Sequence, residues 1–125
     1  MTHALANQLA NATLRNQTYT SPGNVYASLY TTPPTASTSG TEYSGNGYSR
    51  VNVTFSNPAN GVISSNVVVT FGPATGNNWT SINAVGIVDA STSGNLMYFQ
   101  GIATRNVKIG DSLVFDTGNI SVAIT

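Results

Sequence analysis

Short segments in which apolar and polar residues alternate recur from Val25 almost to the end of the chain. In RVNVTF, Val51, Val53 and Phe55 share one face of an extended chain, and Asn52 and Thr54 share the other. Successive side chains of a β-strand point to opposite faces, so this period of two is typical of strands. The pattern limits most of the chain to an all-β fold.

Other segments repeat this pattern between clusters of turn residues. Strands are expected in VYASLY, VIS, VVVTF, SINAVGIVD, LMYFQGIA, SLVF and ISVAIT, with turns at NPANG, GPATGNN, STSGN and DTGN. SINAVGIVD is apolar on both faces, which predicts a central strand covered on both sides. LMYFQGIA is also apolar on both faces and is expected to form a hairpin with it. Seven to nine short strands at this spacing predict a single jelly-roll-like β-sandwich, with the last strand running to Thr125.

A helix is expected only near the N-terminus. Leu5, Leu9 and Ala12 recur at spacings of four and three, which predicts a helix over about residues 4–15. We therefore divide the chain into a helical arm, residues 1–17, and a sandwich domain, residues 18–125. Two interpretations of the arm stay open: it covers one end of the sandwich, or it anchors the protein to a neighbouring subunit.

Residues 31–49 contain adjacent prolines and repeated Gly and Ser, which predicts a long exposed loop. Tyr43 and Tyr48 within it suggest that part of the loop packs against something. Trp79, at the start of a strand, is either a surface anchor or a core residue whose N–H bonds to a loop carbonyl, and the second is commoner for a lone Trp. As candidate interaction residues we select Leu5, Leu9, Tyr43, Tyr48 and Trp79.

The charge content argues against several classes of partner. Only 6% of the residues are charged and the net charge is zero, whereas 58 of 125 residues are Thr, Asn, Ser or Gly. A nucleic-acid-binding protein normally carries a basic excess, so nucleic acid is not expected as a partner. No segment is apolar enough to cross a membrane, and the N-terminus lacks a secretory signal. We therefore expect the chain to be made and assembled in the cytoplasm.

Groups that could perform chemistry are scarce. The chain has no cysteine, a single histidine, His3, and four acids: Glu42, Asp89, Asp111 and Asp116. A hydrolase needs a base beside its nucleophile, and a glycosidase needs two carboxylates across a cleft. The acids are dispersed and do not form a closely spaced calcium-binding run. We predict no catalytic, cofactor or metal site, and hence not an enzyme.

Several segments, taken in order, carry a family resemblance. The chain resembles a family of small virion structural proteins of tailed bacteriophages, labelled tail-fibre-like. The segments that carry the resemblance are TLRNQTYTSPGNVYASLYTTPPT, GTEYSGNGYSRVNVTFSNPANGVISSN, the strand from Trp79 to Asp89 with GNLMYFQ, and GDSLVFDTGNISVAIT. The resemblance implies a non-enzymatic β-sandwich present in many copies of the virion.

The resemblance leaves the position on the virion open. A compact chain without a repetitive shaft favours a capsid decoration or cement protein, bound as a trimer or dimer to the major capsid protein on the capsid surface. The alternative is a tail or tail-fibre component, with host-glycan binding as a possible role.

Overall fold

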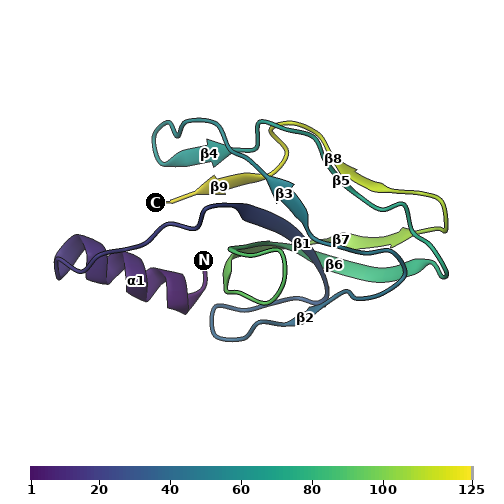
Figure 1. Cartoon of the computed structure of the whole chain (residues 1–125), viewed down its shortest axis with the longest axis horizontal. Helices are drawn as coiled ribbons and strands as arrows, with labels where there is room; N and C mark the ends of the chain where they lie inside the picture. Colours follow the sequence, from purple (N-terminus) through teal and green to yellow (C-terminus); the bar gives the residue numbers. More distant parts are fainter. Residues whose placement is uncertain (125) are drawn as a thin grey trace.

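A computed structural model describes residues 1–124, and Figure 1 shows an N-terminal helix beside two layers of strands. The elements are α1 His3–Leu14, β1 Val25–Thr32, β2 Thr41–Glu42, β3 Val51–Val53, β4 Val62–Ser64, β5 Val69–Phe71, β6 Trp79–Val88, β7 Leu96–Val107, β8 Leu113–Phe115 and β9 Ser121–Ala123. This order confirms the expected all-β fold with one short N-terminal helix.

The larger layer is a sheet built around β6. Its strands follow the order β2-β1-β6-β7, and β3 pairs with the first half of β1. β6 is antiparallel to both neighbours, with Gly86 opposite Ser28 of β1 and opposite Phe99 of β7. β6 and β7 form a hairpin, and nearly every residue in the second half of β6 is buried. The predicted hairpin and the central, covered position of its first strand are confirmed, whereas β7 forms the edge of the sheet and is largely exposed.

Two short antiparallel pairs form the opposing layer. β4 pairs with β9, placing Ile63 opposite Val122, and β5 pairs with β8, placing Thr70 opposite Val114. Figure 1 shows both pairs stacked over β1, β6 and β7. This packing is that of a β-sandwich, and the jelly-roll arrangement stays a prediction.

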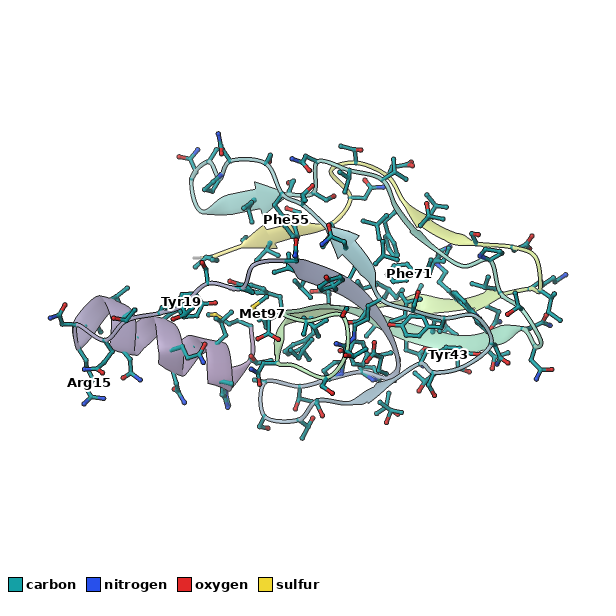
Figure 2. All side chains as sticks on the ribbon, in the orientation of Figure 1. Arg15, Tyr19, Tyr43, Phe55, Phe71 and Met97 are labelled. Carbon is teal, nitrogen blue, oxygen red and sulfur yellow. The ribbon has the colours of Figure 1, made fainter. Side chains whose placement is uncertain are left out.

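The first turn of α1 is joined to the start of β7. The Thr2 hydroxyl caps the helix by accepting from the Leu5 amide at 3.4 Å, and it donates to the Leu96 carbonyl at 2.8 Å. The Thr2 amide donates to the Met97 carbonyl at 2.9 Å. Leu5 is only 5% exposed, whereas Leu14 at the other end is 84% exposed. Figure 2 shows Arg15 pointing away from the strands. The helix therefore contacts the sandwich mainly through its N-terminal end.

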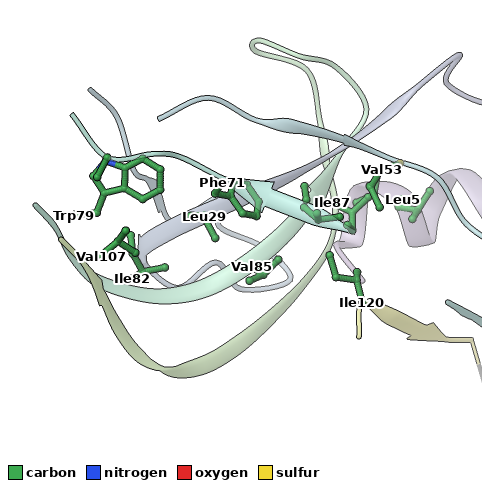
Figure 3. Close-up of a cluster of buried hydrophobic side chains, with 14 residues drawn as sticks. Leu5, Leu29, Val53, Phe71, Trp79, Ile82, Val85, Ile87, Val107 and Ile120 are labelled. Carbon is green, nitrogen blue, oxygen red and sulfur yellow. The ribbon is translucent and has the colours of Figure 1, made fainter. Parts of the chain in front are cut away.

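The core lies between the two layers (Figure 3). Its largest completely buried side chains are Trp79, Phe71, Leu29 and Ile82. Burying an aliphatic or aromatic side chain of this size contributes about 1.5–3 kcal/mol. These residues come from β1, β5 and β6, so the core holds the layers together. The core interpretation of Trp79 is confirmed.

The prediction of an exposed loop over residues 31–49 is wrong in part. β1 continues through Thr32, and β2 returns along it with Glu42 opposite Tyr30. Tyr43 and Tyr48 pack against the core. The physical reason is tertiary, because side chains of this segment bond to strands and loops distant in sequence. The last strand, β9, ends at Ala123, so it is shorter than predicted; Thr125, to which it was expected to run, lies outside the described residues.

Candidate functional site

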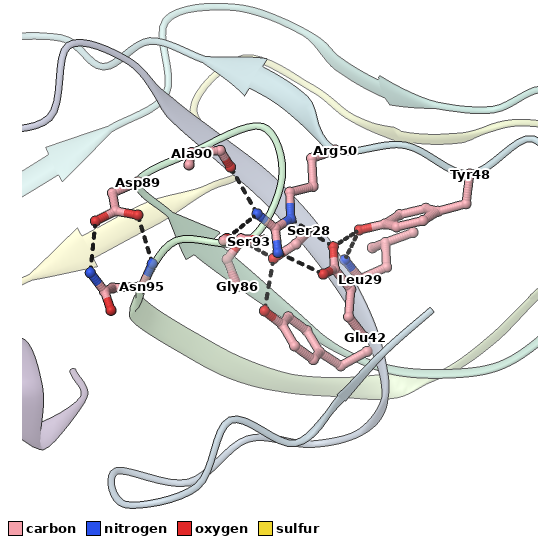
Figure 4. Close-up of polar contacts among 11 residues, drawn as sticks. Ser28, Leu29, Glu42, Tyr48, Arg50, Gly86, Asp89, Ala90, Ser93 and Asn95 are labelled. Carbon is pink, nitrogen blue, oxygen red and sulfur yellow. Dashed lines mark hydrogen bonds and ion pairs between the residues drawn. The ribbon is translucent and has the colours of Figure 1, made fainter. Parts of the chain in front are cut away.

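An ion pair fixes the segment between β2 and β3. Arg50 donates from Nε and one terminal nitrogen to the two oxygens of Glu42, at 2.9 and 2.8 Å. Its other terminal nitrogen donates to the carbonyls of Ala90 and Ser93, at 2.8 and 2.7 Å (Figure 4). The side chains of Arg50 and Glu42 are 12% and 25% exposed. The guanidinium thus joins the edge of the sheet to the β6–β7 turn.

Tyr48 extends this polar cluster. Its hydroxyl donates to a Glu42 oxygen at 2.7 Å and accepts from the Leu29 amide at 3.0 Å. Burial raises the pKa of Glu42, but the hydrogen bonds from Arg50 and Tyr48, with the charge of Arg50, outweigh burial and hold that pKa below its ordinary value. Burial and the bond to Glu42 raise the pKa of Tyr48 far above its ordinary value. Glu42 is therefore held as a carboxylate and Tyr48 as a neutral phenol.

An aromatic cluster lies beside the ion pair. The Tyr43 and Tyr48 rings lie 5.6 and 5.9 Å from the Trp79 ring, and the Tyr48 ring stacks at 6.2 Å on Phe71. The Trp79 indole N–H donates to the Asn46 carbonyl at 2.8 Å. Trp79 is 0% exposed, so neither face of its ring is open to a ligand. Ring geometry and hydrogen bonds together hold residues 43–50 against the sandwich.

The five candidate interaction residues lie in two places. Tyr43, Tyr48 and Trp79 are brought together in the aromatic cluster, while Leu5 and Leu9 lie along α1 and pack against the core from the other end. All five contact their own chain in the structure. A role for them in contacts between subunits stays a prediction.

Asp89 and His3 lie outside the polar cluster around Arg50. Asp89 accepts from the amide and the side-chain nitrogen of Asn95, at 2.7 and 3.3 Å, and so closes the β6–β7 turn. His3 is exposed in the first turn of α1. Within residues 1–124 no three His, Cys, Asp or Glu side chains come together in a way that could hold a metal ion. The same residues contain no helix long and apolar enough to cross a membrane.

A groove of about 390 Å³ opens between the inner faces of β6 and β7 and the C-terminal strand β9. Val85 and Ile87 form part of its floor, and Ile120 and Val122 form part of its opposite wall. None of the side chains that line it is charged. This groove was not predicted from the sequence. Its one sequence signal was the apolar character of both faces of the β6–β7 hairpin.

A known protein family matches nearly the whole chain. A family described as "Podophage GP4 fiber I protein gp80" matches residues 1–123. No curated protein matches the chain. The match extends from the first residue of the arm to the end of β9, so it covers the helix and both layers of the sandwich.

Proposed function

The chain belongs to the podophage GP4 fiber I protein gp80 family of tailed-phage virion structural proteins, and from this premise we propose that it is a non-enzymatic part of the tail-fibre apparatus. The observation that carries the proposal is the family match, which spans residues 1–123 and whose description names a fibre protein. The matched range includes the helix and every strand, so no element of the described fold lies outside the family match.

The surroundings of the ionisable groups support a structural role. Arg50 neutralises Glu42, and Asp89 bonds to its own turn. A general base must reach the group whose proton it removes, and a carboxylate occupied by a guanidinium is poorly suited to that task. In this proposal both acids maintain the shape of the sandwich.

The aromatic cluster also has a structural role in this proposal. Sugar-binding sites commonly present an aromatic ring to the sugar, but Trp79 is completely buried and its N–H is already bonded to Asn46. Recognition of a host glycan through Tyr43, Tyr48 and Trp79 is therefore not favoured. A glycan array with the purified protein tests this, and binding that is lost in Tyr43→Ala would restore the glycan-binding role.

A capsid decoration protein is the second candidate function. The observation in its favour is that helix and strands together form one small sandwich, with no repetitive shaft among residues 1–124. In that case the partner would be the major capsid protein, and the site of attachment the outer surface of the head.

Labelling on intact virions separates the two candidates. Particles that carry a small epitope tag after Ile124, decorated with a gold-labelled antibody fragment, are imaged by electron microscopy. Gold at the tail supports the proposed function, and gold distributed over the head supports the capsid candidate. Tagged particles must retain infectivity, which is the control for normal incorporation. Absence of the tag from purified virions would contradict both.

Within the proposed function, the far end of α1 is the part of the arm best placed to contact a neighbouring subunit. Leu14 is 84% exposed, whereas Leu5 is part of the core, so removal of the whole arm would disturb fold and contact together. We expect Leu14→Lys to reduce incorporation into particles without lowering the melting temperature, because a cation is favourable at a helix C-terminus. Gln8→Lys, exposed on the same helix, is the control. Normal incorporation of Leu14→Lys would contradict the anchor role.

A further inference from the structure

Two Asn-Gly pairs lie in turns of this chain, Asn46 with Gly47 and Asn60 with Gly61. All four residues have positive φ angles, between 52° and 83°. Asparagine and glycine adopt such angles readily, which explains why both pairs form turns. The pair also has a chemical property. Asparagine followed by glycine loses its side-chain amide more readily than other asparagines, because glycine has no side chain to shield its backbone nitrogen.

Asn60 and Gly61 are the two central residues of a tight hairpin turn at the start of β4. The residues that flank them, Ala59 and Val62, exchange backbone hydrogen bonds of 2.9 and 3.0 Å. Asn60 and Gly61 are both exposed, and the turn lies beside the end of β9 (Figure 1). Within residues 1–124 no hydrogen bond holds the Asn60 side-chain amide or the Gly61 N–H. The two groups that would react are thus adjacent, and both are accessible to water.

The other Asn-Gly pair is held by the aromatic cluster. The half-buried Asn46 donates from its side-chain amide to the Tyr43 hydroxyl at 2.8 Å. Its backbone carbonyl accepts from the Trp79 indole at 2.8 Å and from the Thr75 amide at 2.9 Å. A Cβ added at Gly47 would lie 2.7 Å from the Thr75 hydroxyl, so the glycine of this pair is closely surrounded as well. A reaction between the two residues would require these contacts to open first.

We propose that Asn60 is a modification site, at which the folded chain deamidates spontaneously and acquires a carboxylate. The Gly61 nitrogen forms a bond to Cγ of Asn60, and the bond from Cγ to the side-chain nitrogen breaks. Ammonia leaves with the proton of the Gly61 N–H, and a cyclic imide remains. Water then opens the imide at either carbonyl group, which yields aspartate or isoaspartate. The inference goes beyond the proposed function and holds for a tail or a head position.

The two products change the molecule in different ways. Both add one negative charge to a chain whose net charge is zero. Aspartate leaves the main chain as it was, and Asp-Gly suits the same turn. Isoaspartate routes the main chain through the former side chain and so inserts a methylene group into the turn. Gly61 accepts from the Ile124 amide at 2.8 Å, and Val62 pairs with Ala123. Isoaspartate should therefore loosen the pairing of β4 with β9.

Both Asn-Gly pairs can be followed in one experiment on the full chain. Trypsin cleaves after Arg50 and Arg105, so Asn46 and Asn60 are released on different peptides. The purified chain is incubated in mildly alkaline buffer, and mass spectrometry with peptide fragmentation locates each deamidated residue. In the folded chain we expect Asn60 to react at least about tenfold faster than Asn46, because local opening must precede reaction at Asn46. In guanidinium chloride, which unfolds the chain, the two rates should become similar.

Asn60→Gly is the matched control for the consequences of the reaction. Glycine accepts the positive φ of this position and has no amide to lose, so the variant should fold and circular dichroism should show it. Incubated wild-type chain should become more acidic in isoelectric focusing and melt at a lower temperature, whereas incubated Asn60→Gly should do neither. Asn60→Asp carries the charge with an unaltered main chain and should melt close to the fresh wild type.

Three results would overturn the proposal. The first is equal reaction at Asn46 and Asn60 in the folded chain. The second is a folded chain in which Asn60 does not react although both residues react in guanidinium chloride. The third is an equal gain of acidity in incubated wild type and incubated Asn60→Gly, which would place the reaction elsewhere in the chain.

Discussion

At the scale of single residues, the Arg50 side chain connects segments that lie far apart in the sequence. Its guanidinium bonds to both oxygens of Glu42 and to the carbonyls of Ala90 and Ser93, some forty residues along the chain. Alternation of apolar residues contains no information about such a bond, because the partner carbonyls belong to the backbone of a remote turn. The role of Arg50 was therefore not predicted from the sequence.

Replacement of Arg50 should be strongly destabilising. Arg50→Met leaves the Glu42 carboxylate and two carbonyls without their partner, and loss of one member of a buried pair costs about 3–5 kcal/mol. Since Glu42 is partly exposed, we expect about 3 kcal/mol, measured as the free energy of unfolding in urea. Arg15→Met is the matched control. Arg15 is exposed and bonds only within its own helix, so a change below about 0.5 kcal/mol is expected. Equal effects of the two substitutions would contradict the role of Arg50.

At the scale of elements, the packing of β6 against its neighbours depends on Gly86, which has no side chain. A Cβ added at Gly86 would lie 2.7 Å from a Leu96 methyl carbon, 2.8 Å from the Tyr30 ring and 3.1 Å from the Ser28 hydroxyl. Overpacking of this kind costs about 1–3 kcal/mol. We expect Gly86→Ala to lower the free energy of unfolding by about 2 kcal/mol. Gly23→Ala, where no atom lies within 4 Å of the added Cβ, should change stability by less than about 1 kcal/mol. A neutral Gly86→Ala would show that the hairpin can shift to accept a methyl group.

The two ends of α1 should respond differently to truncation. Leu5 is buried in the core, so Leu5→Ala leaves a cavity and should lower the free energy of unfolding by about 2–3 kcal/mol. Leu14 is exposed, and Leu14→Ala should change it by less than about 0.5 kcal/mol. Chemical denaturation followed by circular dichroism measures both. Similar values for the two variants would mean that the helix is not docked through its first turn.

The elements themselves were largely predictable from the sequence. The helix, the strands beginning at Val25, Val51 and Trp79, and the β6–β7 hairpin follow from apolar periodicity and turn residues, which are local signals. β2 was missed because Thr41 and Glu42 form too short a strand to show any alternation. The packing of Tyr43 and Tyr48 was indicated only by their presence in a polar segment.

At the scale of the whole molecule, the arrangement of the two layers of strands could not be predicted from the sequence. The sequence indicated a sandwich, but the positions of strand edges depend on pairing between distant segments. The apolar faces of the β6–β7 hairpin were therefore evident from the sequence, but the position of the opening between β7 and β9 was not. The low charge, in contrast, was evident from composition and bears directly on how the molecule responds to pH.

The pH dependence of stability should be dominated by one cluster. The chain has four acids and one histidine, and among them the lowered pKa of Glu42 stands out, with burial opposed and outweighed by the bonds from Arg50 and Tyr48. The folded state then binds a proton at Glu42 more weakly than the unfolded state does. The contribution of Glu42 to the free energy of unfolding is fully present above a pH of about 4.5, the ordinary carboxyl pKa. It is lost as the pH falls through the lowered pKa of Glu42 in the folded state.

The buried tyrosines should determine how the free energy of unfolding changes at alkaline pH. Burial raises the pKa of Tyr48 and of Tyr30, so the folded state favours their neutral forms. This stabilisation is complete below a pH of about 10 and is lost as the pH rises above it. The free energy of unfolding should therefore be nearly constant between about pH 6 and pH 9 and fall on both sides, which urea denaturation over a pH series measures.

Glu42→Gln isolates the acid side of this profile. Glutamine keeps the shape of the side chain but has no charge and no proton to gain. Its contact with Arg50 is weaker than that of the carboxylate, so the variant should be less stable than the wild type at neutral pH. Because the titrating group is gone, it should lose less stability than the wild type between about pH 6 and pH 3. The two curves should converge at low pH, where the wild-type carboxylate is also protonated. Parallel curves over that range would mean that another group controls acid unfolding, and the cluster around Arg50 would then have only a packing role.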